Sequence, residues 1–221
     1  ASEVSLASNG HIGKKTSYLV SVRQSYLQFL FDMLDLPFLP TFTDVQFKLK
    51  TRFDKQNELT ILGLGGIGNM RLNTKADSED NEYILSYLPK TKQETFTLGS
   101  VYRHYAGAHV QSIVVSHSYL NNRNTKYRQN DESVPDNLML RLRSTEQETK
   151  FRFENKTSIR NWKINLGVNL DYSQYSNTTF QKIYTNQAQI FDYHTYLDIL
   201  RWGIFGTVNY SSMDERFTAS L

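Results

Sequence analysis

Histidine and acidic side chains are the residues of this sequence whose types could support metal binding or catalysis. His104, His109 and His117 follow one another at spacings of five and eight residues. Strand residues that share a face are separated by even numbers, and the same-face pair His109 and His117 would lie about 26 Å apart along one strand. These spacings fit no metal-ligand pattern, so we expect no metal and no cofactor.

The segment FDYHTY places Asp192 and His194 on one face of an extended chain. General acid-base catalysis needs such groups within hydrogen-bond reach of a shared water. No second acidic pair is identifiable on another loop, so two polar residues in a surface loop are the simpler interpretation. The chain has no cysteine, which excludes disulfides, thiolate metal sites and a cysteine nucleophile.

Composition favours strands over helices. Among 221 residues there are 14 Tyr and 13 Phe but only 4 Pro, and aromatic residues are enriched in strands. The net charge is +3 with no block of like charges, so a tail that binds nucleic acid is not indicated. No run of about 18 apolar residues predicts a transmembrane helix, but the alternating strands of a transmembrane barrel would give no such run.

Alternation of apolar and polar residues is the strongest pattern in the chain, and it predicts strands with one apolar face. It is strictest in residues 161–175, where Trp162 and Tyr172 end the apolar side. Ten segments show it wholly or in part: 3–12, 17–26, 43–53, 58–68, 94–105, 109–120, 149–156, 161–175, 201–212 and 216–221.

The connections between these segments alternate in length. Five are tight turns, with the sequences GKK, DKQN, AGA, SIRN and MDE. The others are long, and the clearest are residues 28–41, 74–93, 121–137 and 176–194. Unstructured loops of that length are uncommon in compact soluble domains. Short turns on one side and long loops on the other predict an all-β, antiparallel up-and-down barrel of the outer-membrane type.

The dimensions of the strands match a membrane. From Trp162 to Tyr172 the tilted strand would rise roughly 25 Å, the height of a lipid-facing band between aromatic girdles. We expect the following residues to face lipid or form the girdle: Tyr18, Tyr26, Phe47, Phe153, Trp162, Leu166, Tyr172, Trp202 and Tyr210. We expect a second set to face the lumen: Arg23, Lys48, Lys50, Arg52, Lys150, Arg152, Lys163 and Asp171.

Ten strands leave two arrangements open. The first and last segments both look cut short, and an open sheet edge in lipid would leave backbone groups unpaired at several kcal/mol each. Either the ten strands close into a small barrel, or they form part of a larger one.

The first 70 residues contain a set of motif residues in a characteristic order: Gly13, Lys14, Lys15, Ser17, Tyr18, Arg23, Tyr26, Leu36, Pro37, Asp44, Gln46 and Lys48. With this set, residues 1–70 resemble the early barrel of TonB-dependent outer-membrane receptors. The sequence departs from the family at His11, where Pro is common, and at Glu58, where Lys is frequent.

The resemblance implies a 22-stranded barrel with an N-terminal plug and a TonB box. Residues 1–221 would then be the N-terminal portion of the barrel domain, without the plug, in the outer membrane of a Gram-negative bacterium. The implied function is active uptake of a scarce solute, namely a siderophore, vitamin, glycan or peptide. The resemblance therefore implies that the chain is not an enzyme. The lumen-facing set would pair with plug residues or line the solute path. The implied partners are outer-membrane lipid, TonB and a surface-exposed lipoprotein, with no nucleic acid.

Two alternatives remain at this stage. One is a complete ten-stranded outer-membrane barrel of protease type, with Asp192 and His194 at its rim. The other is a soluble β-rich binding module, in which a second layer of the protein would cover the apolar face of the sheet.

Overall fold

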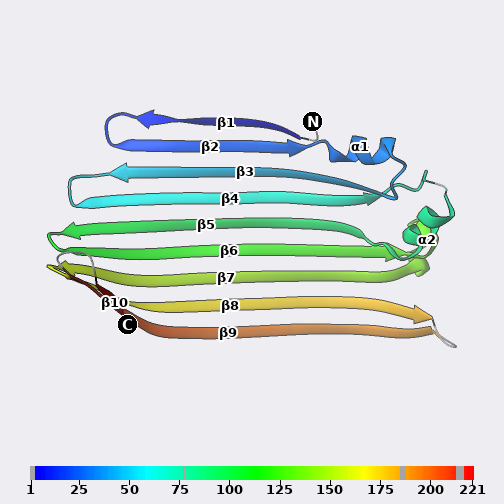
Figure 1. The fold of residues 1–221 in the computed structure, drawn as a ribbon. Helices are drawn as coiled ribbons and strands as arrows, with labels where there is room; N and C mark the ends of the chain where they lie inside the picture. Colours follow the sequence, from blue (N-terminus) through cyan, green and yellow to red (C-terminus); the bar gives the residue numbers. More distant parts are fainter. Residues whose placement is uncertain (1–2, 77, 185–187, 213–216) are drawn as a thin grey trace.

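The chain forms a single antiparallel sheet of ten strands. The computed structural model describes residues 3–76, 78–184, 188–212 and 217–221. Each strand pairs with the next one in sequence (Figure 1). The strands are β1 (Glu3–Ile12), β2 (Thr16–Ser25), β3 (Phe38–Arg52), β4 (Asn57–Leu72), β5 (Lys90–Ala106), β6 (His109–Tyr127), β7 (Leu138–Ile159), β8 (Trp162–Tyr184), β9 (Ala188–Ser211) and β10 (Thr218–Ser220). The predicted fold class is thereby confirmed.

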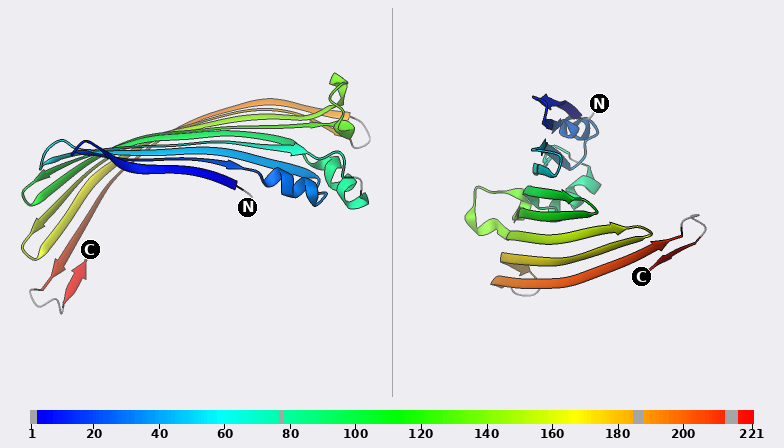
Figure 2. Two further views of the ribbon diagram at one scale, coloured as in Figure 1. Left: turned by 90° about the horizontal axis from the view of Figure 1, so that it is seen from above. Right: turned by 90° about the vertical axis from the view of Figure 1, so that its left-hand side faces the viewer.

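The sheet is open within the described residues. β1 pairs only with β2, and β10 only with β9, so these two strands lie at opposite edges. Figure 2 shows the sheet twisted and bent rather than closed into a cylinder. Of the two arrangements left open by the sequence, the closed ten-stranded barrel is therefore not the one that the described residues form.

Short turns gather at one end of the sheet and longer connections at the other, as predicted. The short turns span 13–15, 53–56, 107–108 and 160–161. Gly13 and Gly107 have positive φ in two of them, a conformation that glycine adopts without strain. The other end carries α1 (Leu27–Met33), α2 (Glu79–Tyr87), η1 (Arg128–Asn130) and η2 (Pro135–Asn137). The predicted MDE turn lies outside the described residues.

The predicted long loops are shorter than expected, because the strands continue into them. Residues 121–127 belong to β6, and residues 90–93 belong to β5. The predicted loop 176–194 is paired strand except for residues 185–187, which are not described. Thr, Tyr, Phe and Ile are frequent there, and these types favour strands. The apolar alternation fades there while the backbone ladder continues.

Direct cross-strand pairs define two faces of the sheet. The apolar face contains the row Tyr18, Leu49, Ile61, Ser100, Val115, Phe151, Leu170 and Trp202, together with every second residue on either side of it. The charged face contains the row Leu19, Lys48, Leu62, Gly99, Ser116, Lys150, Asp171 and Arg201, with its own alternate neighbours.

No second layer covers the apolar face in the described structure. Trp202 and Ile204 are 74% and 76% exposed, and Leu6 is 77% exposed. Among the described residues, the buried hydrophobic side chains are Pro37, Ala76 and Leu85, which lie in the longer connections. An apolar face of this kind is stable only against an apolar environment outside the chain. None of the described helices is long and apolar enough to cross a membrane.

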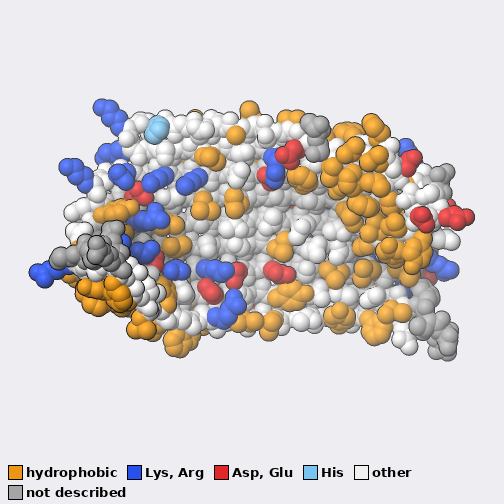
Figure 3. Space-filling model, in the orientation of Figure 1, with side chains coloured by type: hydrophobic (Ala, Val, Ile, Leu, Met, Phe, Trp, Pro, Cys, Tyr) orange, Lys and Arg blue, Asp and Glu red, His pale blue; other side chains and the backbone are white. Residues whose placement is uncertain are grey.

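The type of side chain on one face of the sheet changes along the strands. Figure 3 shows one face, on which Lys and Arg gather toward the short turns while hydrophobic side chains gather toward α1 and α2. There α1 packs on β3, with the ring of Phe31 edge-on to that of Phe38 at 5.3 Å. The basic half of this face is the part that can bind a charged partner.

Candidate functional site

The charged face carries all eight residues of the predicted lumen-facing set. Cross-strand register places Lys150 directly opposite Asp171, and Arg52 directly opposite Glu58. Most of the set lies in the half of the face nearer the short turns. Arg23 lies apart, farther toward the longer connections, and donates from Nε to Asp44 Oδ2 at 2.8 Å. The structure therefore brings seven of the eight together as one basic surface.

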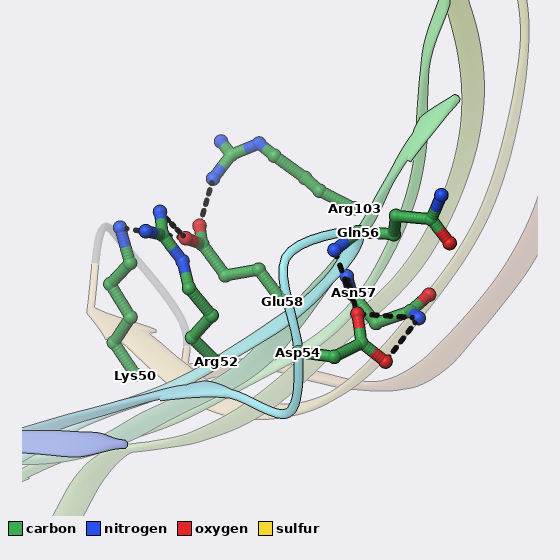
Figure 4. Close-up of polar contacts among 7 residues, drawn as sticks. All are labelled: Lys50, Arg52, Asp54, Gln56, Asn57, Glu58 and Arg103. Atoms are coloured by element: carbon green, nitrogen blue, oxygen red, sulfur yellow. Dashed lines mark hydrogen bonds and ion pairs between the residues drawn. The ribbon is translucent and has the colours of Figure 1, made fainter. Parts of the chain in front are cut away.

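A buried carboxylate organises one side of this surface (Figure 4). The side chain of Glu58 is only 2% exposed, and cations from three strand positions converge on it. Lys50 Nζ and Arg52 Nη2 lie 3.1 and 3.2 Å from Oε2, and Arg103 Nη1 lies 3.3 Å from Oε1. Burial of a single carboxylate is costly unless it is paired, and here both oxygens have charged partners.

The local sequence explains how this cluster forms. The turn at residues 53–56 sets the register of the β3–β4 hairpin, so that Arg52 and Glu58 are direct partners. The register of β4 with β5 then places Arg103 on the other side of Glu58. Lys50 lies two residues before Arg52 and therefore on the same face. One turn, the register of β4 with β5 and the strand period together assemble the site.

Asp54 fixes that turn with amide donors in place of cations. Its Oδ1 accepts hydrogen bonds from the backbone N–H groups of Gln56 and Asn57 at 2.7 and 2.8 Å. The Asn57 side chain donates from Nδ2 to both carboxylate oxygens (Figure 4). These bonds hold the pKa of the Asp54 carboxyl below its ordinary value, because they stabilise the ionised form. The bond from the Asn57 side chain has the largest effect.

A second carboxylate is held between two cations on β7 and β9. Glu148 lies 2.8 Å from Lys150 Nζ through Oε2 and 3.1 Å from Arg201 Nη2 through Oε1. The hydroxyl of Ser173 donates to Oε1 at 3.4 Å. This arrangement repeats the principle of the Glu58 cluster on the opposite side of the basic surface.

A third carboxylate, Glu154, lies between Arg152 and Lys156. The closest nitrogen to oxygen distances are 3.3 and 3.6 Å, and the Glu154 side chain is only 13% exposed. The Arg152 guanidinium also lies over the ring of Phe205, 4.4 Å from its centroid. The ring and the carboxylate together fix the orientation of this guanidinium.

Cations outnumber carboxylates on the basic surface. The cations are Lys48, Lys50, Arg52, Arg103, Lys150, Arg152, Lys156, Lys163 and Arg201. The carboxylates are Glu58, Glu148, Glu154 and Asp171. Among the described contacts, Lys48 and Lys163 have no ion pair. The carboxylates hold the cations in place without neutralising them, so the surface attracts anionic groups.

The predicted girdle residues lie on the apolar face, with one correction. Trp162 and Tyr210 are direct partners and their rings lie 4.8 Å apart, at the short-turn end. Phe47 lies over Gly63, where a Cβ would come within 2.2 Å of the Phe47 ring. Tyr26 was expected to belong to the strand, but β2 ends at Ser25 and Tyr26 is the N-cap residue of α1. The backbone turns there because Ser25 Oγ accepts from the Leu27 N–H at 3.1 Å.

Comparison with known proteins identifies the fold. No protein-family model matches the sequence, and no curated sequence matches it. Solved structures do match. The ferripyoverdine receptor of the outer membrane of Pseudomonas aeruginosa matches with TM-score 0.66 and 9% identity, over 96% of this chain and 33% of the receptor. This chain has the fold of a TonB-dependent receptor barrel.

Two further receptor barrels support that assignment of the fold. The copper transporter OprC matches with TM-score 0.60 and 11% identity, over 94% of this chain and 34% of OprC. The ferric citrate transporter FecA matches with TM-score 0.56 and 14% identity, over 96% of this chain and 34% of FecA. The chain thus spans about a third of the length of these structures, as a portion of a receptor barrel.

Four of the five histidines of this receptor-barrel portion contact residues on adjacent strands. Nδ1 of His104, His109 and His117 lies 2.9, 2.8 and 3.0 Å from side-chain oxygens of residues on adjacent strands. The groups of His, Cys, Asp and Glu within the described residues include none that could hold a metal ion. His194 lies in β9 and not in a loop, and its Nδ1 is 3.1 Å from the backbone oxygen of Asn177.

Sequence reasoning missed the carboxylates that organise the basic surface of the barrel. Glu58 attracted notice only as a departure from the family pattern, and neither Arg103, Glu148, Glu154 nor Arg201 was singled out. The signal that could have found Glu58 is the β3–β4 hairpin, because Arg52 and Glu58 are direct partners across the five residues 53–57. Glu148 and Arg201 lie on strands that are not neighbours, so no local pattern links them.

Proposed function

We propose that this chain forms part of the barrel wall of an outer-membrane transporter that takes up a scarce solute with energy supplied through TonB. The observation that carries the proposal is the match of at least 94% of the chain to three receptors and transporters, combined with an uncovered apolar face. In this arrangement the apolar face contacts lipid and the charged face lines the interior. The short turns lie on the periplasmic side, as is usual for barrels of this type.

The basic surface is the part of the wall that acts in transport. Its excess of cations favours contact with acidic residues of a plug or with an anionic solute. Lys48 and Lys163, which have no described ion pair, are the cations most available for such contacts. Of siderophore, vitamin, glycan and peptide solutes, the basic surface favours anionic members. TonB would act on the plug, and a surface lipoprotein would contact the end with the longer connections.

The two alternatives lack a supporting observation. A closed ten-stranded protease needs β1 paired with β10, but these strands lie at opposite edges. It also needs acidic and histidine groups in contact, whereas His194 is the ladder partner of Thr178 and its Nδ1 contacts the backbone oxygen of Asn177. A soluble module needs a covered apolar face, and Trp202 and Ile204 are largely exposed.

Uptake measurements test the transport proposal. A Gram-negative host expressing the full-length protein is supplied with candidate solutes at limiting concentration, with and without a functional TonB. We expect accumulation of one anionic solute only when TonB is present. Accumulation that is equal in the two strains would rule out energised transport.

Single cysteines test which face contacts lipid, since the natural sequence has none. Leu166→Cys and Asn165→Cys are neighbours on opposite faces. We expect a water-soluble maleimide to label the cysteine at 165 and leave that at 166 unlabelled in membranes. Both should react after unfolding, which serves as the control. Equal labelling in the membrane would contradict the assignment of the faces.

A further inference from the structure

A row of cations crosses three adjacent strands on the apolar face, toward the longer connections. Lys92 on β5 is the direct partner of Arg123 on β6, and Arg123 is the direct partner of Arg143 on β7. Like charges directly opposite each other destabilise a sheet. We call Lys92, Arg123 and Arg143 the cation row.

One neighbouring residue adds to the positive charge of the cation row, and one carboxylate partly offsets that charge. Arg141 lies two residues beyond Arg143 on the same face. Glu94 is the carboxylate nearest the cation row, 2.6 Å from Lys92 Nζ and 3.8 Å from Arg123 Nη2. Arg143 has no ion pair among the described contacts. The side chains of Lys92 and Arg123 are 46% and 45% exposed, so all three cations are accessible from outside the sheet.

Two hollows flank the row. One, of about 340 Å³, is lined by Arg141, Arg143 and Thr178. The other, of about 390 Å³, lies on the apolar side of the row, where Gly65 leaves space beside Val45 and the stacked rings of Phe96 and Tyr119. Phe96 lies about 13 Å from Lys92 along β5. Glu94, between them, lines the apolar hollow and contacts Lys92 Nζ. A polar site and an apolar site therefore adjoin on one face.

We propose that the cation row binds the phosphate groups of a lipid headgroup in the leaflet on the side of the longer connections. Arg presents donors that match phosphate oxygens, and a bound phosphate removes the repulsion within the row. The row extends about 10 Å over two strand spacings, which accommodates a headgroup with two phosphates. Acyl chains of the same lipid occupy the hollow beside Phe96 and Tyr119. The inference rests on the membrane placement proposed above.

Lipid retention by the native protein in detergent micelles tests this inference. The probe is a bisphosphorylated diglucosamine lipid, compared with its phosphate-free form and with inorganic phosphate. We expect retention of the phosphorylated lipid only, weakening with added salt. Equal retention of the phosphate-free lipid would overturn the proposal. Displacement of the lipid by an equal concentration of inorganic phosphate would also overturn it, because the site would then be a simple anion site.

Charge-matched variants localise the binding. The triple variant K92Q/R123Q/R143Q should bind the phosphorylated lipid at least about tenfold more weakly, since several charge-assisted bonds are lost. The control K14Q/K55Q/K75Q removes the same charge from exposed lysines in turns and connections, and should bind like the natural protein. Equal binding by the two variants would overturn the proposal.

A stability measurement separates lipid binding from misfolding. Without the lipid, the triple variant should unfold at a temperature no lower than that of the natural protein. With the lipid, only the natural protein and the lysine control should be stabilised. A lower unfolding temperature of the triple variant without lipid would make the row structural and overturn the proposal. Failure of the membrane placement would appear separately, as a protein that stays monomeric without detergent.

Discussion

Two groups of cations in this sheet are built from the same residue types in opposite ways. In the Glu58 cluster on the charged face, Lys50, Arg52 and Arg103 converge on one buried carboxylate. In the cation row on the apolar face, cations oppose cations, and Arg143 has no described counter-ion. The first group is held together by the protein itself, whereas the second depends on something outside it. Cross-strand register, and not composition, decides which group forms.

The largest expected effect comes from adding a cation to the apolar face, between the level of the cation row and the short turns. Leu166→Arg places a charge in the apolar band and should destabilise the folded protein in lipid vesicles by about 2–4 kcal/mol. The control Ser173→Arg lies on the charged face opposite Glu148 and should change stability little. Urea unfolding from vesicles measures both. Equal losses would mean that the two faces do not differ in environment.

The next effect concerns the carboxylate of the Glu58 cluster. Glu58→Gln keeps the shape but leaves three cations without their counter-charge, and should cost about 2 kcal/mol. This is less than for a fully buried pair, because the partner cations are exposed by 41–62%. Glu3→Gln is the control, since its pair with Arg23 is exposed on both sides. A loss no greater than that of the control would show that burial of Glu58 adds nothing.

Replacement of Arg by Gln should change the free energy of unfolding in opposite directions in the two groups. Arg103→Gln removes a partner of Glu58 and should lower the free energy of unfolding by about 1 kcal/mol. Arg123→Gln removes the centre of the cation row and, in phosphate-free detergent, should raise it by about 0.5 kcal/mol. The two variants are compared by urea unfolding under identical conditions. A loss of stability in both variants would contradict the claim that cations repel one another in the cation row.

The smallest effect is on the turn beside the Glu58 cluster. The pKa of the Asp54 carboxyl is lowered by its amide donors, so its contribution is fully present above the ordinary pKa of an aspartate and is lost as the pH falls through the lowered value. Amide exchange at Gln56 and Asn57 should therefore be less protected near about pH 2 than a correction for the intrinsic rate predicts. Asp54→Asn should show no such pH step. A step that persists in this variant would assign it to another group.

The sequence alone predicted the number of strands and their order in the sheet. It also predicted that short turns lie at one end of the sheet and longer connections at the other. These features are local, because alternation at period two marks each face and short polar segments such as GKK mark each turn. The composition of the faces followed for the same reason, and Lys48, Lys150 and Trp162 lie where their parity placed them. The expected end of the second strand at Tyr26 was wrong by one residue, because β2 ends at Ser25 and Tyr26 is the N-cap residue of α1.

Only the tertiary structure decided which charges meet. Strand length beyond the apolar band carries no alternating signal, so the extension of β8 and β9 through residues 176–194 could not be predicted. The contact of Glu148 with Arg201 depends on strands that are not neighbours, and the row of Lys92, Arg123 and Arg143 depends on two successive registers. A shift of one residue in the pairing of a strand would move all of its side chains to the opposite face. The positions of the charges are therefore determined only by the assembled sheet.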